Sequence, residues 1–117
     1  MAGAFTFGIE EEHFLVDAGT KNLVDGACEA FFDEAEETLG DRVSREFLLP
    51  QVELITSPHQ DVAGARAELR DLRHRVAAIA ARHGLATLAV GTHPTAAWRD
   101  VEQTPKQRYD AVMTISR

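Results

Sequence analysis

Apolar and polar residues alternate along residues 4–16, and this period of two predicts a β-strand. One face of the strand would carry Phe5, Phe7 and Ile9. The sequence DAGTKN at residues 17–22 is rich in turn-forming residues. A short strand around Leu23–Val24 is therefore expected to pair back as a hairpin.

Two segments show helical spacing of their apolar residues. The first runs from Cys28 to Leu39 and is followed by Gly40, a typical residue after a helix end. The second covers residues 60–83 and is followed by Gly84. Its predicted apolar stripe consists of Val62, Ala65, Leu69, Leu72, Val76, Ile79 and Ala80. The acidic run 33–37 and the arginines from Arg66 to Arg82 are expected to face solvent.

The remaining segments complete a mixed pattern. Residues 43–58 predict a strand or a broken strand pair, with Pro50 at an edge or a bulge because proline cannot donate a ladder hydrogen bond. Residues 85–90 predict a short buried strand, 91–98 a loop and 106–117 the start of a helix. The expected fold class is α+β, an antiparallel sheet with helices packed on one side, and we interpret residues 1–117 as one unit.

Composition narrows the class of protein. The chain has 117 residues, 44% of them hydrophobic, and a formal net charge of −7. Residues 1–60 hold 13 acidic and 3 basic residues, whereas residues 61–117 hold 6 acidic and 9 basic ones. An acidic chain is a poor candidate for nucleic-acid binding, and we expect neither a nucleic-acid nor a membrane partner. A single cysteine, Cys28, is typical of a reducing compartment, so we expect a cytoplasmic protein.

Three adjacent glutamates in the first strand suggest a metal site. Alternation places Glu10 and Glu12 on one face and Glu11 on the other. Two carboxylates on one face repel each other, and a hard cation such as Mg²⁺ would remove that cost. A second acidic strand offers Glu46 and Glu53. The alternative is an exposed acidic edge that discourages aggregation.

Five stretches, in order, resemble one enzyme family. They are FTFGIEEEHFLVD, QVELITSP, ARAELRDLRHRVAAIAARHGL, LAVGTHPTAAW and RYDAVM. Together they span Phe5 to Met113 and resemble the bacterial type 2 branch of the glutamate–cysteine ligase family, which consists of carboxylate–amine ligases. The resemblance implies the N-terminal part of a fold like that of glutamine synthetase.

That resemblance also implies an activity. Such ligases use ATP to phosphorylate the γ-carboxylate of glutamate, and an amine such as cysteine then attacks the acyl phosphate. Magnesium or manganese ions are held by glutamates on an antiparallel sheet. Carried over to this chain, Glu10, Glu12 and Glu53 would be catalytic metal ligands, and Glu46 would be a fourth ligand.

Two further residues are candidates for substrate binding. Arg108 could bind a phosphate or a carboxylate with its guanidinium, or it could be an ordinary surface arginine. His93 in the sequence GTHP could orient a ligand, or it could shape the loop through backbone hydrogen bonds.

The family's members are several hundred residues long, so we expect this chain to be the N-terminal part of a longer or split ligase. An exposed apolar sheet surface would favour self-association or a complementary C-terminal chain. A second hypothesis is a non-catalytic fragment that binds a divalent metal ion or a partner subunit.

Overall fold

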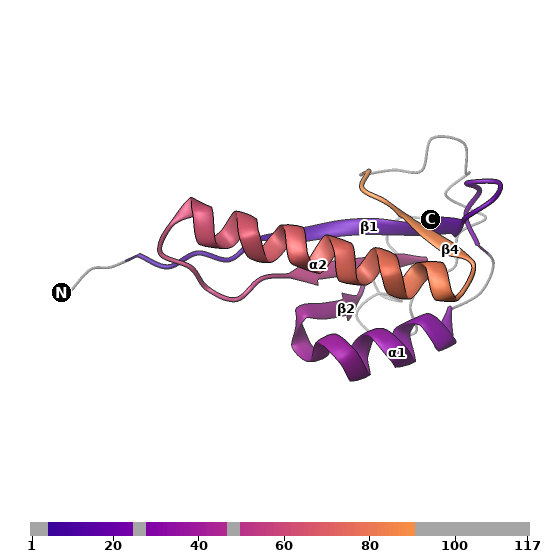
Figure 1. The fold of residues 1–117 in the computed structure, drawn as a ribbon, viewed down its shortest axis with the longest axis horizontal. Helices are drawn as coiled ribbons and strands as arrows, with labels where there is room; N and C mark the ends of the chain where they lie inside the picture. Colours follow the sequence, from indigo (N-terminus) through magenta and orange to yellow (C-terminus); the bar gives the residue numbers. More distant parts are fainter. Residues whose placement is uncertain (1–4, 25–27, 47–49, 91–117) are drawn as a thin grey trace, which may run out of the picture.

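The computed structural model describes residues 5–24, 28–46 and 50–90, which form an α+β fold with a four-stranded sheet and two α-helices (Figure 1). The elements follow in the order β1 (Glu10–Asp17), α1 (Glu29–Leu39), the short 3₁₀ helix η1 (Gly40–Arg42), β2 (Val43–Arg45), β3 (Gln51–Ile55), α2 (Val62–Arg82) and β4 (Leu85–Leu88). The predicted fold class is confirmed to this extent. The link to the glutamine-synthetase-like fold stays a prediction.

The sheet has the order β2-β3-β1-β4, and every neighbouring pair is antiparallel. The strand β3 pairs with residues 10–14 of β1, whereas β4 pairs with residues 14–17 on the other side. Within the described residues, the acidic half of β1 therefore has a strand partner on only one of its two edges.

Both helices end where the glycines predict. Gly40 has a φ of 57° after α1, and Gly84 has a φ of 71° shortly after α2. An L-residue rarely adopts this left-handed region, so glycine is the natural residue there. At the start of α2, the side chain of Asp61 accepts a hydrogen bond of 2.7 Å from the backbone N–H of Gly64 and so caps the helix.

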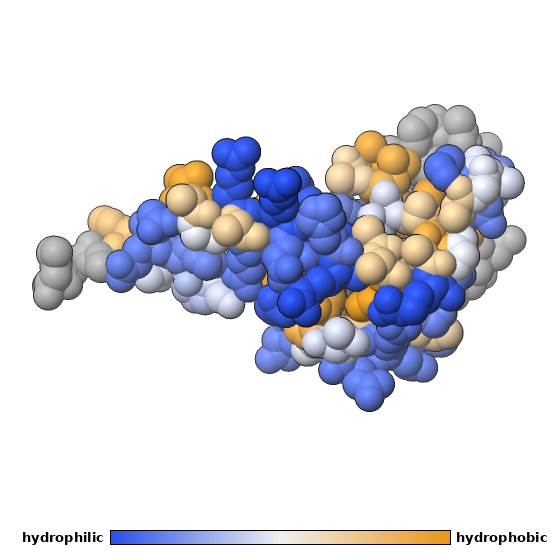
Figure 2. Space-filling view, viewed as in Figure 1, coloured by the Kyte–Doolittle hydropathy of each residue, from blue (hydrophilic) through white to orange (hydrophobic). Residues whose placement is uncertain are grey.

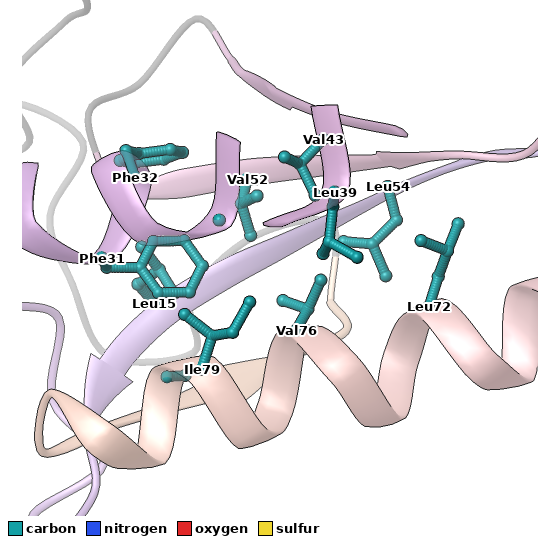
Figure 3. Close-up of a cluster of buried hydrophobic side chains, with 12 residues drawn as sticks. Leu15, Phe31, Phe32, Leu39, Val43, Val52, Leu54, Leu72, Val76 and Ile79 are labelled. Carbon is teal, nitrogen blue, oxygen red and sulfur yellow. The ribbon is translucent and has the colours of Figure 1, made fainter. Parts of the chain in front are cut away.

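The hydrophobic core lies between one face of the sheet and the two helices (Figure 3). From the sheet, Leu15, Val52 and Leu54 point into it, and all three are fully buried. The partners from the helices are Phe31, Phe32, Ala35 and Leu39 of α1 and Leu72, Val76, Ile79 and Ala80 of α2. Each fully buried Leu or Phe contributes about 2 kcal/mol to folding. This packing fixes which face of β1 and β3 points away from the helices.

Three predicted details are wrong. The first strand begins at Glu10 rather than near residue 4. The preceding segment contacts residues 56–59 through a bridge between Phe7 and His59 and through hydrogen bonds between Ile9 and Thr56. Val62 is 72% exposed because the first turn of α2 lies past the end of the strands (Figure 1). The segment predicted as a buried strand over 85–90 is a half-buried edge strand, Leu85–Leu88.

Other predictions are confirmed by the described residues. The broken strand pair over 43–58 is the antiparallel pair of β2 and β3, with Pro50 directly before β3. The helix arginines are exposed, and Figure 2 shows hydrophilic residues over much of the middle of α2. The predicted loop 91–98 and helix start 106–117 lie outside the described residues. Neither α-helix combines the length and hydrophobicity needed to cross a membrane.

Candidate metal centre

Glutamates from neighbouring strands share the sheet face that points away from the helices. Side chains alternate along β1, so Glu10 and Glu12 point away from the core. Glu53 of β3 lies directly opposite Glu12 in the register and opposite Ser44 of β2 on its other side. Glu46 follows Ser44 by two residues and therefore belongs to the same face.

The structure brings three of these four carboxylates into a group that could bind one ion. Glu12, Glu46 and Glu53 can each offer a carboxylate oxygen within 4.8 Å of the others. Glu12 is exposed, whereas Glu46 and Glu53 are half-buried. Glu10 lies outside this trio, opposite Ile55 in the register, but on the same face of β1. We call Glu12, Glu46 and Glu53 the carboxylate trio.

An open cleft of about 560 Å³ adjoins the trio at the edge of β1 that has no strand partner within residues 5–24, 28–46 and 50–90. Its lining residues are Glu10, Glu11, Glu12, Glu53, Arg73, Ala89 and Val90. The last two follow β4 in the chain, so the cleft lies between the acidic half of β1 and the segment that leaves the edge strand. Four glutamates and one arginine line the cleft, so most of its charged side chains are carboxylates.

The electrostatics of Glu53 show that it is repelled by the neighbouring carboxylates. Burial raises the pKa of Glu53 to about 7, with further contributions from a side-chain hydrogen bond with Glu46 and from the charges of Glu46, Glu10 and Glu12. Near neutral pH, Glu53 is therefore protonated in part of the molecules. A bound cation would relieve this repulsion, and a set of carboxylate oxygens fits the hard ions Mg²⁺ and Mn²⁺.

Glu11 points to the opposite face of β1, as alternation predicts, and its charge is compensated there. Arg73 of α2 donates from Nε to Glu11 Oε1 over 2.7 Å and from its NH2 group to Oε2. His13 Nε2 lies 2.5 Å from the same Oε1. The hydrogen bond from Arg73 is the main cause that lowers the pKa of Glu11 to about 2, against the opposing effect of burial. Glu11 is therefore an anion at all physiological pH values.

Sequence reasoning missed the role of Arg73, because Arg73 and Glu11 are 62 residues apart. The local pattern of α2 placed this arginine with the other solvent-facing ones. One signal was present: a glutamate on the core-facing side of a strand needs a cation from the element that covers it. The predicted substrate-binding residues Arg108 and His93 lie outside the described residues.

Comparison with known proteins identifies the family. The sequence model of glutamate–cysteine ligase family 2 matches residues 6–117. The chain belongs to this family. Similar relatives carry the name "Putative glutamate--cysteine ligase 2". One from Bradyrhizobium sp. (strain ORS 278) is 47% identical over 109 residues, which are 93% of this chain and 27% of the relative.

Two further relatives with the same name agree with this. The one from Ruegeria pomeroyi is 44% identical over 112 residues, 96% of this chain and 29% of the relative. The one from Rhodospirillum rubrum is 41% identical over 111 residues, 92% of this chain and 28% of the relative. The chain thus spans little more than a quarter of these members of glutamate–cysteine ligase family 2.

Proposed function

We propose that this chain supplies metal-binding strands to an ATP-dependent ligase that joins the γ-carboxylate of glutamate to an amine such as cysteine. The observation that carries the proposal is the carboxylate trio in a chain of glutamate–cysteine ligase family 2. Membership suggests the reaction class, and the trio suggests how this part of the protein takes part. The ligase would contain residues outside the described part.

The chemistry explains why carboxylates are needed. Forming an acyl phosphate brings the phosphates of ATP close to a substrate carboxylate, so negative charges must be neutralised and held in line. A bound Mg²⁺ or Mn²⁺ would supply that neutralisation. Glu12, Glu46 and Glu53 would hold the ion, and Glu10 would add negative charge from the same strand face.

The chain's own residues would have two tasks. The buried side chains Leu15 and Leu54 anchor β1 and β3 to the helices, which keeps the carboxylates on the opposite face in fixed register. Glu53 holds a proton in part of the molecules near neutral pH and would release it when a cation takes its place. The cleft beside the trio is open, so any shelter of an acyl phosphate from water would come from residues outside the described part.

The test is ADP release by a full-length protein that contains this chain. We expect release to require Mg²⁺, glutamate and an amine, with cysteine as the first amine to try. Glu12→Gln and Glu53→Gln should each lower the rate by about 100-fold or more. Glu37→Gln, an equal charge change at an exposed position of α1, serves as the control.

Two results would contradict the proposal in different ways. Full activity of Glu12→Gln and Glu53→Gln would refute the metal-ligand roles. No ADP release with any amine, in a folded protein that binds Mg²⁺, would refute the ligase activity. The latter result would favour the second candidate, a non-catalytic module that binds a divalent metal ion, which the carboxylate trio also supports.

A further inference from the structure

The acidic half of β1 is held less firmly by the sheet than the rest of the strand. Residues 10–14 pair with β3, but β4 reaches only residues 14–17 on the other edge. Among the described residues, the backbone from Glu10 to His13 thus pairs on one edge alone. Residues 15–17 pair with β4 and are also held by backbone hydrogen bonds from Leu15 to Pro50 and from Asp17 to Asn22. Residues 10–13 include three adjacent carboxylates, whose repulsion opposes a fixed arrangement.

A second attachment lies on the reverse face of this half-strand. Glu11 binds Arg73 of α2 through two hydrogen bonds, which is the planar, two-point geometry that arginine and carboxylate favour. His13 adds a contact of 2.5 Å to the same carboxylate. The His13 side chain is buried, with 5% of the residue exposed. Its Nδ1 has no hydrogen-bond partner within the described part of the chain.

The contacts of Arg73 and His13 with Glu11 lie at the centre of the acidic half of β1. Glu11 lies between Glu10 and Glu12 in the chain, so a restraint on its side chain restrains the two peptide units that carry its neighbours. The helix α2 is anchored independently by the fully buried Leu72 and Val76. Arg73 therefore links a rigid element to the acidic half of β1, which among the described residues pairs with β3 alone.

We infer that Arg73 is a positioning residue, which holds the acidic half of β1 through Glu11 so that Glu12 stays in register with the rest of the carboxylate trio. The inference rests on the proposed metal-binding function. Arg73 does not need to touch the ion or the substrate in this role.

Charge and position predict opposite effects when Arg73 is removed, which makes the inference testable. Arg73→Gln removes a positive charge beside Glu11 and the carboxylate trio, and charge alone would then strengthen cation binding. Loss of the restraint would instead disorder Glu12 and weaken binding. The direction of the change in Mg²⁺ affinity thus separates the two effects.

The experiment measures Mg²⁺ binding by titration calorimetry, with Mg²⁺ alone as the probe, at about pH 8 where Glu53 is mostly ionised. We expect Arg73→Gln to bind about tenfold more weakly than the wild type. Arg73→Lys should recover part of the affinity, because it keeps the charge and one donor. The matched control is Arg75→Gln, which removes an equally exposed arginine of α2 whose ion-pair partner is Asp71.

Amide hydrogen exchange without metal supplies a second, independent measurement. Arg73→Gln should speed exchange at residues 10–13 but not at residues 15–17. Those residues pair with β4, and Leu15 N–H and Asp17 N–H also donate to the carbonyls of Pro50 and Asn22. Arg75→Gln should change neither segment.

The outcomes separate this inference from the proposed function. Unchanged or tighter Mg²⁺ binding by Arg73→Gln would overturn the positioning role while leaving the metal site intact. If the wild type itself binds no Mg²⁺, the metal site fails and exchange alone decides: faster exchange confined to residues 10–13 supports the restraint by Arg73, and unchanged exchange overturns it.

Discussion

Replacing Glu53 by glutamine should stabilise the metal-free protein at alkaline pH, which is unusual for the loss of a charge from a sheet. Glu53 has a pKa of about 7 instead of 4.5, because it is half-buried and close to other carboxylates. Its raised pKa means that the folded state favours the protonated form. The associated stability is fully present below pH 4.5 and is lost as the pH rises through 7.

The size of the effect follows from this shift. Each tenfold change in proton affinity corresponds to about 1.4 kcal/mol, which gives an upper bound of about 3 kcal/mol. Since Glu53 keeps contact with solvent, screening reduces the expected value to about 1–2 kcal/mol. Glutamine has nearly the same shape as protonated glutamate and does not ionise, so Glu53→Gln should gain this amount at pH 8 and almost nothing at pH 4.

The assay is urea unfolding of wild type and Glu53→Gln at both pH values, with EDTA present to remove divalent ions. The difference between the two proteins isolates Glu53 from the other titrating carboxylates. Glu37→Gln on the exposed face of α1 controls for the general change in net charge. A Glu53→Gln protein that is less stable than the wild type at pH 8 would refute the account of repulsion within the cluster.

Three further predictions concern the metal and the fold. Mg²⁺ binding at pH 7 should release about half a proton, because Glu53 is half-protonated at that pH. Calorimetry would show this as a binding heat that depends on the buffer, and a buffer-independent heat would contradict it. Leu72→Ala should lower the free energy of unfolding by about 3 kcal/mol, because the side chain is fully buried between α2 and the sheet; a loss below about 1 kcal/mol would be inconsistent with that packing. Asp61→Ala should cost about 1 kcal/mol by removing the cap of α2, whereas Asp61→Asn should retain most of it; equal stability of all three proteins in urea would argue against the cap.

The elements that sequence reasoning predicted well are those whose signals are local. Both helices were predicted from the spacing of apolar residues and from the glycines that follow them, and each depends on contacts within a few turns. The alternation along β1 likewise predicted that Glu10 and Glu12 share a face while Glu11 turns to the other, because a period of two needs no knowledge of the partner strand.

The features that were missed depend on residues far apart in the chain. The pairing of Glu12 with Glu53 was suggested by composition, but its register is set by how β1 and β3 pack on the helices. The ion pair of Arg73 with Glu11 had no local signal in α2. The exposure of Val62 depends on where the sheet ends beneath α2, which periodicity does not specify.

The central claim is that the carboxylate trio holds a divalent metal ion, and Mn²⁺ binding tests it most directly. Mn²⁺ prefers the same oxygen ligands as Mg²⁺. The electron paramagnetic resonance signal of free Mn²⁺ is lost when the ion binds, so the measurement needs no enzyme assay. We predict saturable binding by the wild type and by Glu37→Gln, with affinity at least about tenfold lower in Glu12→Gln and in Glu53→Gln. Equal Mn²⁺ binding by all four proteins, or none by the wild type, would contradict the account.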